Sequence, residues 1–367
     1  MKLTENRIQN FKCRLHVLGP LFIGSGERLE KSEYVMDMQE KRIYVMDNIK
    51  MFEGLNRCKL LDKFEAEVMD SRYKVDLTRF IRNNNIPHAE YKQWAKYSYP
   101  ADIDTNQKGT QIMAFIKDPY NMPYVPGSSL KGAIRNCMLN AVLINSGEKE
   151  GIISELASIS QYESRELRNC LNKKSRELDV LFHSAKRTDN VSNAVNSIFQ
   201  GLRISDSLPL PTDCLTLCSK LDTPVNGNAK QLPIHRECIA PGTVIEFDVT
   251  IDKKYFPYDE KDLYKFINIM YNNEKECFLS HFPDVQSAQG NVLYLGGGTG
   301  FVSKTAVYSL TDNRIKAVDA ARKILENQFR GKHGKDLTVS PHMRKCTRYK
   351  MKTYDFGLCS IDFQPMA

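Results

Sequence analysis

The stretch YVPGSSLKGAIR, residues 124–135, combines a tight turn with two basic residues at helical spacing. The turn precedes a predicted helix from Ser128 to Ile144, whose first N–H groups and dipole would attract a phosphate. Lys131 and Arg135 are four residues apart, so they would share one face of that helix beside its start. The candidate phosphate ligands in this stretch are Ser128, Ser129, Lys131 and Arg135. A capped helix that carries two solvated cations is the alternative, and the spacing alone does not decide between them.

A second glycine-rich stretch, LYLGGGTGF at residues 293–301, is followed closely by a lysine. Glycines let the backbone approach a ligand closely, so a sugar–phosphate chain could lie on this loop. Phe301 stands where the last glycine of a dinucleotide-binding fingerprint belongs, and Lys131 precedes Gly132 where a Walker A loop needs the reverse order. Neither nucleotide motif is therefore supported. The candidate ligands here are Gly296, Gly297, Gly298, Gly300 and Lys304, with a plain tight turn as the alternative.

Cysteines and histidines offer two further kinds of chemistry. Ligand types suited to zinc occur at Cys214, Cys218, His235 and Cys238. Ordinary buried thiols are the simpler interpretation of this set, so we expect no cofactor and no metal. A metal-free ribonuclease would use a histidine as its general acid or base. The histidines that could serve are His16, His235 and His342, for which packed or structural roles are the alternative.

The charge of the chain is concentrated in one segment. The 367 residues carry a net charge of +8, and residues 303–352 hold thirteen Lys and Arg against four Asp and Glu. A localised basic segment favours a polyanionic partner. No apolar run approaches the length of a membrane span, and the first residues do not resemble a signal peptide. With ten cysteines, such a chain is expected to be cytoplasmic, with free thiols.

Strands and long helical segments alternate irregularly, which predicts an α+β fold of the ferredoxin-like kind rather than a doubly wound parallel sheet. Strands are predicted over residues 11–23, 34–38, 42–46, 197–204, 214–220, 243–251 and 354–363. Helices are predicted over residues 48–83, 128–144, 148–186, 259–282 and 312–330. Asn226 and Gly227 mark a hairpin turn. We expect the polar segment 87–110 on the surface, where Trp94, Tyr97 and Tyr99 could stack on bases, although packing down on the surface is the simpler role.

Five stretches occur in an order that resembles one group of proteins. They are LGPLFIGSGE near the start, VPGSSLKGAIR, LRISDS at 202–207, HRECIAPGTVIEF at 235–247, and LGGGTGF with a following lysine. Together they resemble the RAMP superfamily of CRISPR-associated proteins, and their order and spacing most resemble the subunit-five family of the type III-A Csm complex. The resemblance extends from about residue 11 to residue 363. It adds Gly24, Ser25 and Gly26 to the candidate RNA ligands, because they match the loop after the first strand.

The resemblance implies two ferredoxin-like, RRM-like RAMP modules with helical insertions and a thumb-like hairpin at residues 220–234. We place these modules at residues 1–235 and 236–367. The implied function is binding of CRISPR RNA, capping the 3′ region of the guide and supporting its 3′ maturation and complex assembly in antiviral defence, without catalysis. The implied partners are the guide and target RNA, other Csm subunits, especially the RAMP backbone subunit and the small subunit, and a host trimming nuclease. An endoribonuclease that acts on the guide precursor or target RNA is the alternative.

Overall fold

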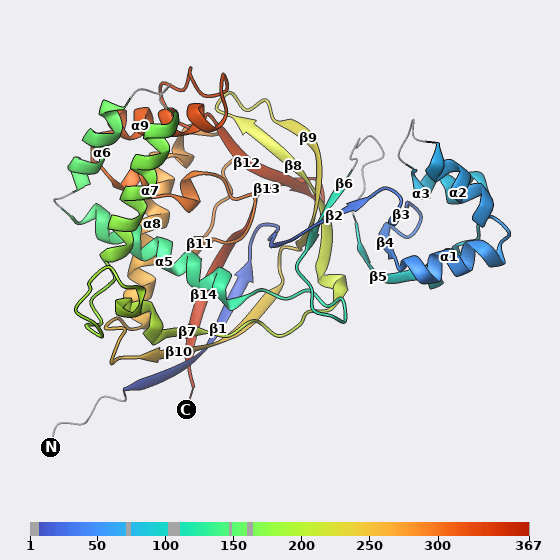
Figure 1. Ribbon diagram of the computed structural model, residues 1–367, viewed down its shortest axis with the longest axis horizontal. Helices are drawn as coiled ribbons and strands as arrows, with labels where there is room; N and C mark the ends of the chain where they lie inside the picture. The colour runs from blue at the N-terminus through green and yellow to red at the C-terminus, as the bar shows by residue number, and fades with distance from the viewer. Residues whose placement is uncertain (1–6, 71–74, 102–110, 147–148, 160–163, 367) are drawn as a thin grey trace.

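A five-stranded sheet lies at the centre of the larger part of the molecule (Figure 1). The computed structural model describes residues 7–70, 75–101, 111–146, 149–159 and 164–366. The strands, in spatial order, are β11 (Val292–Tyr294), β14 (Leu358–Pro365), β1 (Ile8–Val17), β10 (Val244–Asp252) and β7 (Leu202–Ile204). All four neighbouring pairs are antiparallel. Alternate residues of β1 are buried, as its period-two pattern predicts, so one face of this sheet supports the main core.

Helices cover that buried face of the sheet. The helices α5 (Gly127–Ile144) and α8 (Glu260–Cys277) contribute their apolar residues to the same core as β1. A second apolar cluster joins α6 (Lys149–Ser158), α7 (Ser164–Val180) and α9 (Arg314–Gln328) behind them. The short 3-10 helices are Lys92–Trp94, Ala194–Asn196, Ile198–Gly201, Thr212–Cys214, Leu279–His281, Val302–Lys304 and Val307–Ser309. In the described residues, no helix is both long and apolar enough to cross a membrane.

A second sheet, of six strands, lies beside the central sheet (Figure 1). Its order is β13 (Lys352–Asp355), β12 (Met343–Tyr349), β8 (Leu215–Pro224), β9 (Lys230–Ile239), β6 (Gln111–Phe115) and β2 (Gly24–Glu30). The predicted hairpin is confirmed, because β8 and β9 pair antiparallel across a turn in which Gly227 has a φ of 81°. The pairing of β6 with β9 is parallel.

A small three-stranded sheet lies at the right of Figure 1, with one face on a core of its own and the other on the main core. It contains β3 (Tyr34–Asp37), β4 (Arg42–Met46) and β5 (Ala95–Pro100), covered by α1 (Asn48–Arg57), α2 (Leu61–Met69), α3 (Leu77–Asn83) and α4 (His88–Tyr91). The expectation that residues 87–110 lie on the surface is wrong for the described part, because Trp94 and Tyr99 are fully buried in the cores. The Tyr97 hydroxyl donates a hydrogen bond to Glu237, 2.8 Å away. These rings support packing rather than base stacking. Residues 102–110 lie outside the described residues.

The α+β fold is confirmed, with several local differences from the predicted elements. The glycines at 24–26 begin β2 at an irregular pairing instead of forming a turn. The predicted strand at 354–363 divides into β13 and β14, because Gly357 turns the chain at a φ of 66°. Half of the predicted strand at 197–204 is the 3-10 helix Ile198–Gly201, and its last three residues form β7. The module boundary after residue 235 falls inside β9, and the central sheet takes strands from both sides of it, so this division stays a prediction.

Candidate nucleic-acid interface

A pocket of about 490 Å³ lies where the first turns of α5 meet the glycine segment after β11 and the start of β2. The predicted ligands that line it are Gly24, Ser129, Arg135, Gly296, Gly297 and Lys304. The predicted ligands outside its lining are Ser25, Gly26, Ser128, Lys131, Gly298 and Gly300. The Asn136 side chain donates a hydrogen bond to the Ser303 carbonyl at 3.0 Å and thereby fixes α5 to the end of the glycine segment. The fold thus brings together three stretches that are far apart in sequence.

The glycine segment packs against the first stretch through backbone atoms. The N–H of Gly297 donates a hydrogen bond to the Phe22 carbonyl at 2.6 Å. Gly296 has a φ of 82°, and a Cβ on it would lie 2.2 Å from the same carbonyl oxygen. Only glycine combines this conformation with this close approach. The wall of the pocket is therefore bare backbone held at a fixed position.

The start of α5 is held by the stretch LRISDS in a similar way. The N–H of Gly127 donates to Asp206 Oδ1 at 2.8 Å, and a Cβ on Gly127 would lie 2.3 Å from the Ile204 carbonyl. The Ser129 N–H donates to the Pro126 carbonyl at 2.9 Å. These two N–H groups are therefore already used within the chain, and the Asp206 carboxylate is the anion that this helix start holds.

The two basic residues of α5 have different surroundings. Arg135 lines the pocket, forms an ion pair with Asp179 of α7 and lies over the Phe199 ring at 5.7 Å. Lys131 lies outside the lining, and its pKa is lowered by burial and by the positive charge of Arg203. The predicted basic pair therefore supplies one cation to this pocket, and that cation is already paired.

Unpaired positive charge comes instead from Lys304 and from Arg236. Lys304 forms no ion pair within the described chain, and its pKa is lowered by burial and by the charge of Arg236. The Arg236 guanidinium lies between the Phe22 and Phe356 rings, 5.2 and 5.1 Å from their centroids. Its Nε and Nη1 atoms are buried and have no hydrogen-bond partner in the described residues. A Cβ on Gly298 would lie 2.6 Å from Nη1, so this cation sits directly beneath the glycine segment.

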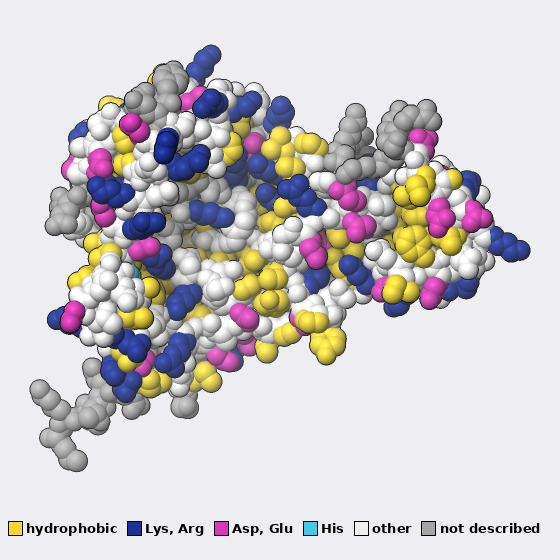
Figure 2. All heavy atoms as spheres, viewed as in Figure 1, with side chains coloured by type: hydrophobic (Ala, Val, Ile, Leu, Met, Phe, Trp, Pro, Cys, Tyr) yellow, Lys and Arg dark blue, Asp and Glu magenta, His cyan; other side chains and the backbone are white. Residues whose placement is uncertain are grey.

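Sequence reasoning missed Arg236. Its stretch, HRECIAPG, is part of the family resemblance, but Arg236 is not among the candidate ligands that the sequence indicates. Nothing in the spacing reveals that a guanidinium from β9 stacks beneath a loop some sixty residues later. On the face shown in Figure 2, many Lys and Arg side chains lie over the larger part of the molecule.

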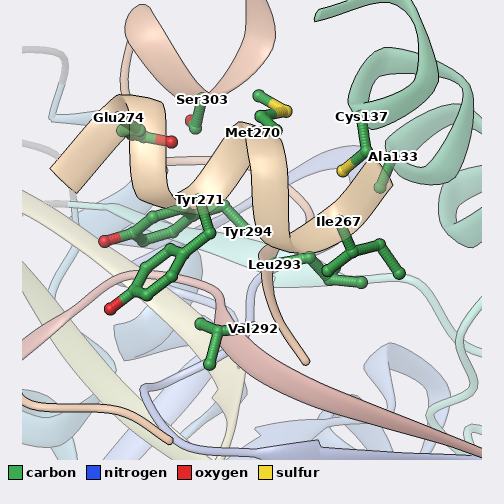
Figure 3. A pocket seen from close by; sticks show the side chains of 10 residues that line it. All are labelled: Ala133, Cys137, Ile267, Met270, Tyr271, Glu274, Val292, Leu293, Tyr294 and Ser303. Atoms are coloured by element: carbon green, nitrogen blue, oxygen red, sulfur yellow. The ribbon is translucent and has the colours of Figure 1, made fainter. Parts of the chain in front are cut away.

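A small cavity of about 10 Å³ adjoins the pocket and shares Ala133, Tyr294 and Ser303 with it (Figure 3). Glu274 of α8 lines this cavity with only 4% of its surface exposed. Burial raises the pKa of Glu274 to about 8, and the charge of Asp355 adds to this effect. Near neutral pH the carboxyl is mostly protonated, so it does not cancel the nearby cations.

The histidines proposed for cleavage lie elsewhere. None of His16, His235 and His342 lines the pocket, and its described lining holds no carboxylate. His235 is buried and shares a hydrogen bond with the Ser219 hydroxyl at 3.0 Å. The described lining of the pocket therefore offers cations and backbone, and neither a histidine nor a carboxylate for general acid–base catalysis.

The four candidate zinc ligands do not form a ligand cluster. In the described residues, His/Cys/Asp/Glu groups with ligand atoms close enough for an ion occur at other positions. Burial raises the pKa of the Cys214 and Cys238 thiols, which disfavours the thiolate form that binds zinc. These residues have the surroundings of buried thiols.

Comparisons with known proteins agree on one family. The model of the RAMP superfamily matches residues 14–303. The chain is 29% identical to the CRISPR system Cms protein Csm5 of Mycobacterium tuberculosis (strain ATCC 25618 / H37Rv), covering 97% of this chain and 98% of that protein. It is 30% identical to the Csm5 protein of Streptococcus thermophilus, covering 82% of this chain and 81% of that protein.

Solved structures have the same fold. A chain of the cryo-EM structure of the Csm–crRNA–target RNA ternary complex in the type III-A CRISPR–Cas system matches with a TM-score of 0.64 and 20% identity, covering 96% of this chain and all of that one. The crystal structure of T. onnurineus Csm5 matches with a TM-score of 0.60 and 18% identity, covering 95% and 99%. The chain therefore belongs to the RAMP superfamily and, within it, to the Csm5 family.

Proposed function

We propose that this protein is the Csm5 subunit of a type III-A Csm complex and that its pocket binds the sugar–phosphate chain of the CRISPR guide RNA in the 3′ region. One observation carries the proposal. Bare backbone at Gly296 and Gly297 and the cations Arg135 and Lys304 line one pocket whose described lining holds no carboxylate. A relative named Csm5 and a structural neighbour solved with crRNA and target RNA support it.

The charges favour phosphate contact over base recognition. Lys304 and Arg236 have no acidic partner within the described chain, so a phosphate would supply the missing negative charge. Single-stranded RNA binds such sites with a strong salt dependence and little sequence preference. The volume of about 490 Å³ also suits a nucleotide-sized group.

The finer roles extend this proposal. Binding the 3′ region would cap the guide, shield it and define where a host nuclease stops trimming. The hairpin β8–β9, whose tip between residues 224 and 231 is largely exposed, would reach the guide–target duplex as a thumb. The partners in contact with this protein would be the RAMP backbone subunit, the small subunit and the target RNA.

The direct test replaces Lys304 with alanine in the assembled, affinity-purified complex. We expect less guide RNA per complex, and a salt dependence of RNA binding that falls by about 0.7 in the log–log slope, the value for one phosphate on a single strand. Lys261→Ala is the matched control, because Lys261 is an exposed lysine at the start of α8, outside the pocket.

Equal guide retention and an unchanged slope in Lys304→Ala would refute the assignment of this pocket. The alternative function has a different signature. Discrete RNA cleavage by the isolated full-length chain, abolished by a single histidine substitution, would favour an endoribonuclease.

A further inference from the structure

Two histidines and a buried aspartate meet in the segment that links α9 to β12. His333 Nδ1 lies 2.9 Å from Asp336 Oδ2, and His342 Nδ1 lies 2.5 Å from Asp336 Oδ1. The ligand atoms of the three residues lie within 4.8 Å of one another. None of the three lines the proposed RNA pocket, so the cluster is a separate feature.

The charge of Asp336 lacks a permanent counterpart. Its side chain is 2% exposed and forms no ion pair with Lys or Arg in the described parts of the chain. Besides the imidazoles, its hydrogen-bond partner is the Ser340 hydroxyl, which donates to Oδ2 at 2.8 Å. A buried carboxylate is costly without a cation. Asp355, a carboxylate that is equally buried, has one, since Arg344 lies 3.1 Å away. Positive charge beside Asp336 therefore comes either from one of the two imidazoles or from a bound cation.

The ligand set fits a divalent transition metal. Two imidazole nitrogens and a carboxylate oxygen are typical zinc ligands. Around zinc, ligand atoms at about 2.0–2.2 Å lie roughly 3.4 Å from one another, so the present contacts would need to open by about 1 Å or less. The His342 side chain is 34% exposed, which gives an ion access and leaves room for a water as fourth ligand.

Surrounding groups already hold the Asp336 carboxylate and the backbone of His333 in place. The Ser340 hydroxyl orients the Asp336 carboxylate, and Tyr308 fixes Ser340 by accepting from its N–H at 3.0 Å and donating to its carbonyl at 2.8 Å. The Glu326 carboxylate accepts a hydrogen bond from the backbone N–H of His333 at 2.7 Å. Such outer contacts typically orient metal ligands and strengthen binding.

A second cluster, formed by Asp37, Glu40 and His88, is less suited to zinc. It offers one imidazole, and the Asp37 carboxylate already accepts a hydrogen bond from the Tyr91 hydroxyl at 2.7 Å. We propose that His333, Asp336 and His342 bind one Zn²⁺ ion, with a water as the fourth ligand. The ion neutralises the buried carboxylate and ties the segment after α9 to the residue before β12.

The test titrates Zn²⁺ into the EDTA-dialysed full-length chain by calorimetry and records the absorption spectrum of the Co²⁺ form. We expect saturation at one equivalent and a tetrahedral Co²⁺ spectrum without a thiolate charge-transfer band. His342→Ala should weaken Zn²⁺ binding by at least about tenfold, since even the loss of an outer contact costs that much. If this variant fails to fold, His342→Gln replaces it.

Two controls separate this site from other possible ligands. Cys214→Ser removes a partly exposed thiol, and His281→Ala removes a half-buried histidine outside the cluster. Both should bind Zn²⁺ as the unmodified chain does. The proposal is overturned by any of three results: no saturation at one equivalent, unchanged affinity in the His342 variant, or a thiolate band that Cys214→Ser removes. None of these results bears on the RNA pocket.

Discussion

The buried carboxyl of Glu274 makes the stability of this protein depend on pH in a predictable direction. Its pKa is about 8 in the folded chain, against 4.5 for an ordinary glutamate, because burial penalises the charged form. No hydrogen bond or ion pair to its carboxyl is formed within the described chain. Replacing Glu274 with glutamine keeps the size of the side chain and removes the titration.

The sign follows from proton binding. Between about pH 4.5 and pH 8 the folded state keeps a proton that the unfolded state has released, so the free energy of unfolding falls as pH rises through this window. Above the folded pKa the effect is constant. At about 1.4 kcal/mol per pKa unit, the full difference corresponds to roughly 3–5 kcal/mol. Glu274→Gln should therefore match the unmodified chain near pH 5 and exceed its stability near pH 8.

The assay is urea unfolding of the full-length chain, followed by circular dichroism at several pH values across this window. Glu276→Gln is the matched control, because Glu276 lies two residues further along α8 and its side chain is 83% exposed. That control should change the stability by less than about 1 kcal/mol at every pH. Parallel pH curves for the Glu274→Gln variant and the unmodified chain would refute the inference that this carboxyl is protonated in the fold.

Two further substitutions test the construction of the pocket. Gly296→Ala should lower the free energy of unfolding by about 2–4 kcal/mol, because the φ of 82° disfavours a side chain and the new Cβ would lie 2.2 Å from the Phe22 carbonyl. Gly132→Ala is the control in the same denaturation assay. Gly132 lies in a helix with open space around it, so this substitution should leave the stability unchanged or raise it. Arg236→Met should leave stability within about 1 kcal/mol or raise it, because it removes a buried unpaired charge while keeping bulk between the two aromatic rings. It should also weaken RNA binding in the salt titration, and a large loss of stability would show that the guanidinium is better compensated than its contacts indicate.

Local patterns predicted much of the fold, because they reflect local physics. The alternating residues of β1 and β10, the turn at Gly227 and the amphipathic α5 are each decided within a few residues of sequence. The burial of Trp94 was not predictable in this way, since it depends on packing against Gly54, where a Cβ would lie 2.0 Å from the indole nitrogen. The polar residues around Trp94 in the sequence do not indicate which distant residue its ring packs against.

The backbone of the pocket and two of its cations, Arg135 and Lys304, were predictable from the sequence, but the partners of its charged groups were not. Glycines that need positive φ or close approach leave a visible sequence pattern, and the structure places Gly24, Gly296 and Gly297 in one pocket. The partners of individual charges depend on elements far away in the chain. The N–H of Gly127, for example, donates a hydrogen bond to Asp206, which lies at the end of a strand some eighty residues later in the sequence. Motif spacing carries no information about such pairings.

The balance of charge around the pocket explains why a polyanion is the fitting partner. Three acidic groups close to the start of α5 already have a partner or a proton: Asp206 accepts a hydrogen bond from a helix N–H, Asp179 pairs with Arg135, and Glu274 keeps its own proton. The cations Lys304 and Arg236 have no such compensation in the described chain. Burying positive charge in this way costs stability, and under the proposed function a bound RNA phosphate would offset that cost. Free chain and assembled subunit should therefore differ in stability most strongly at low salt, where the phosphate contact is strongest.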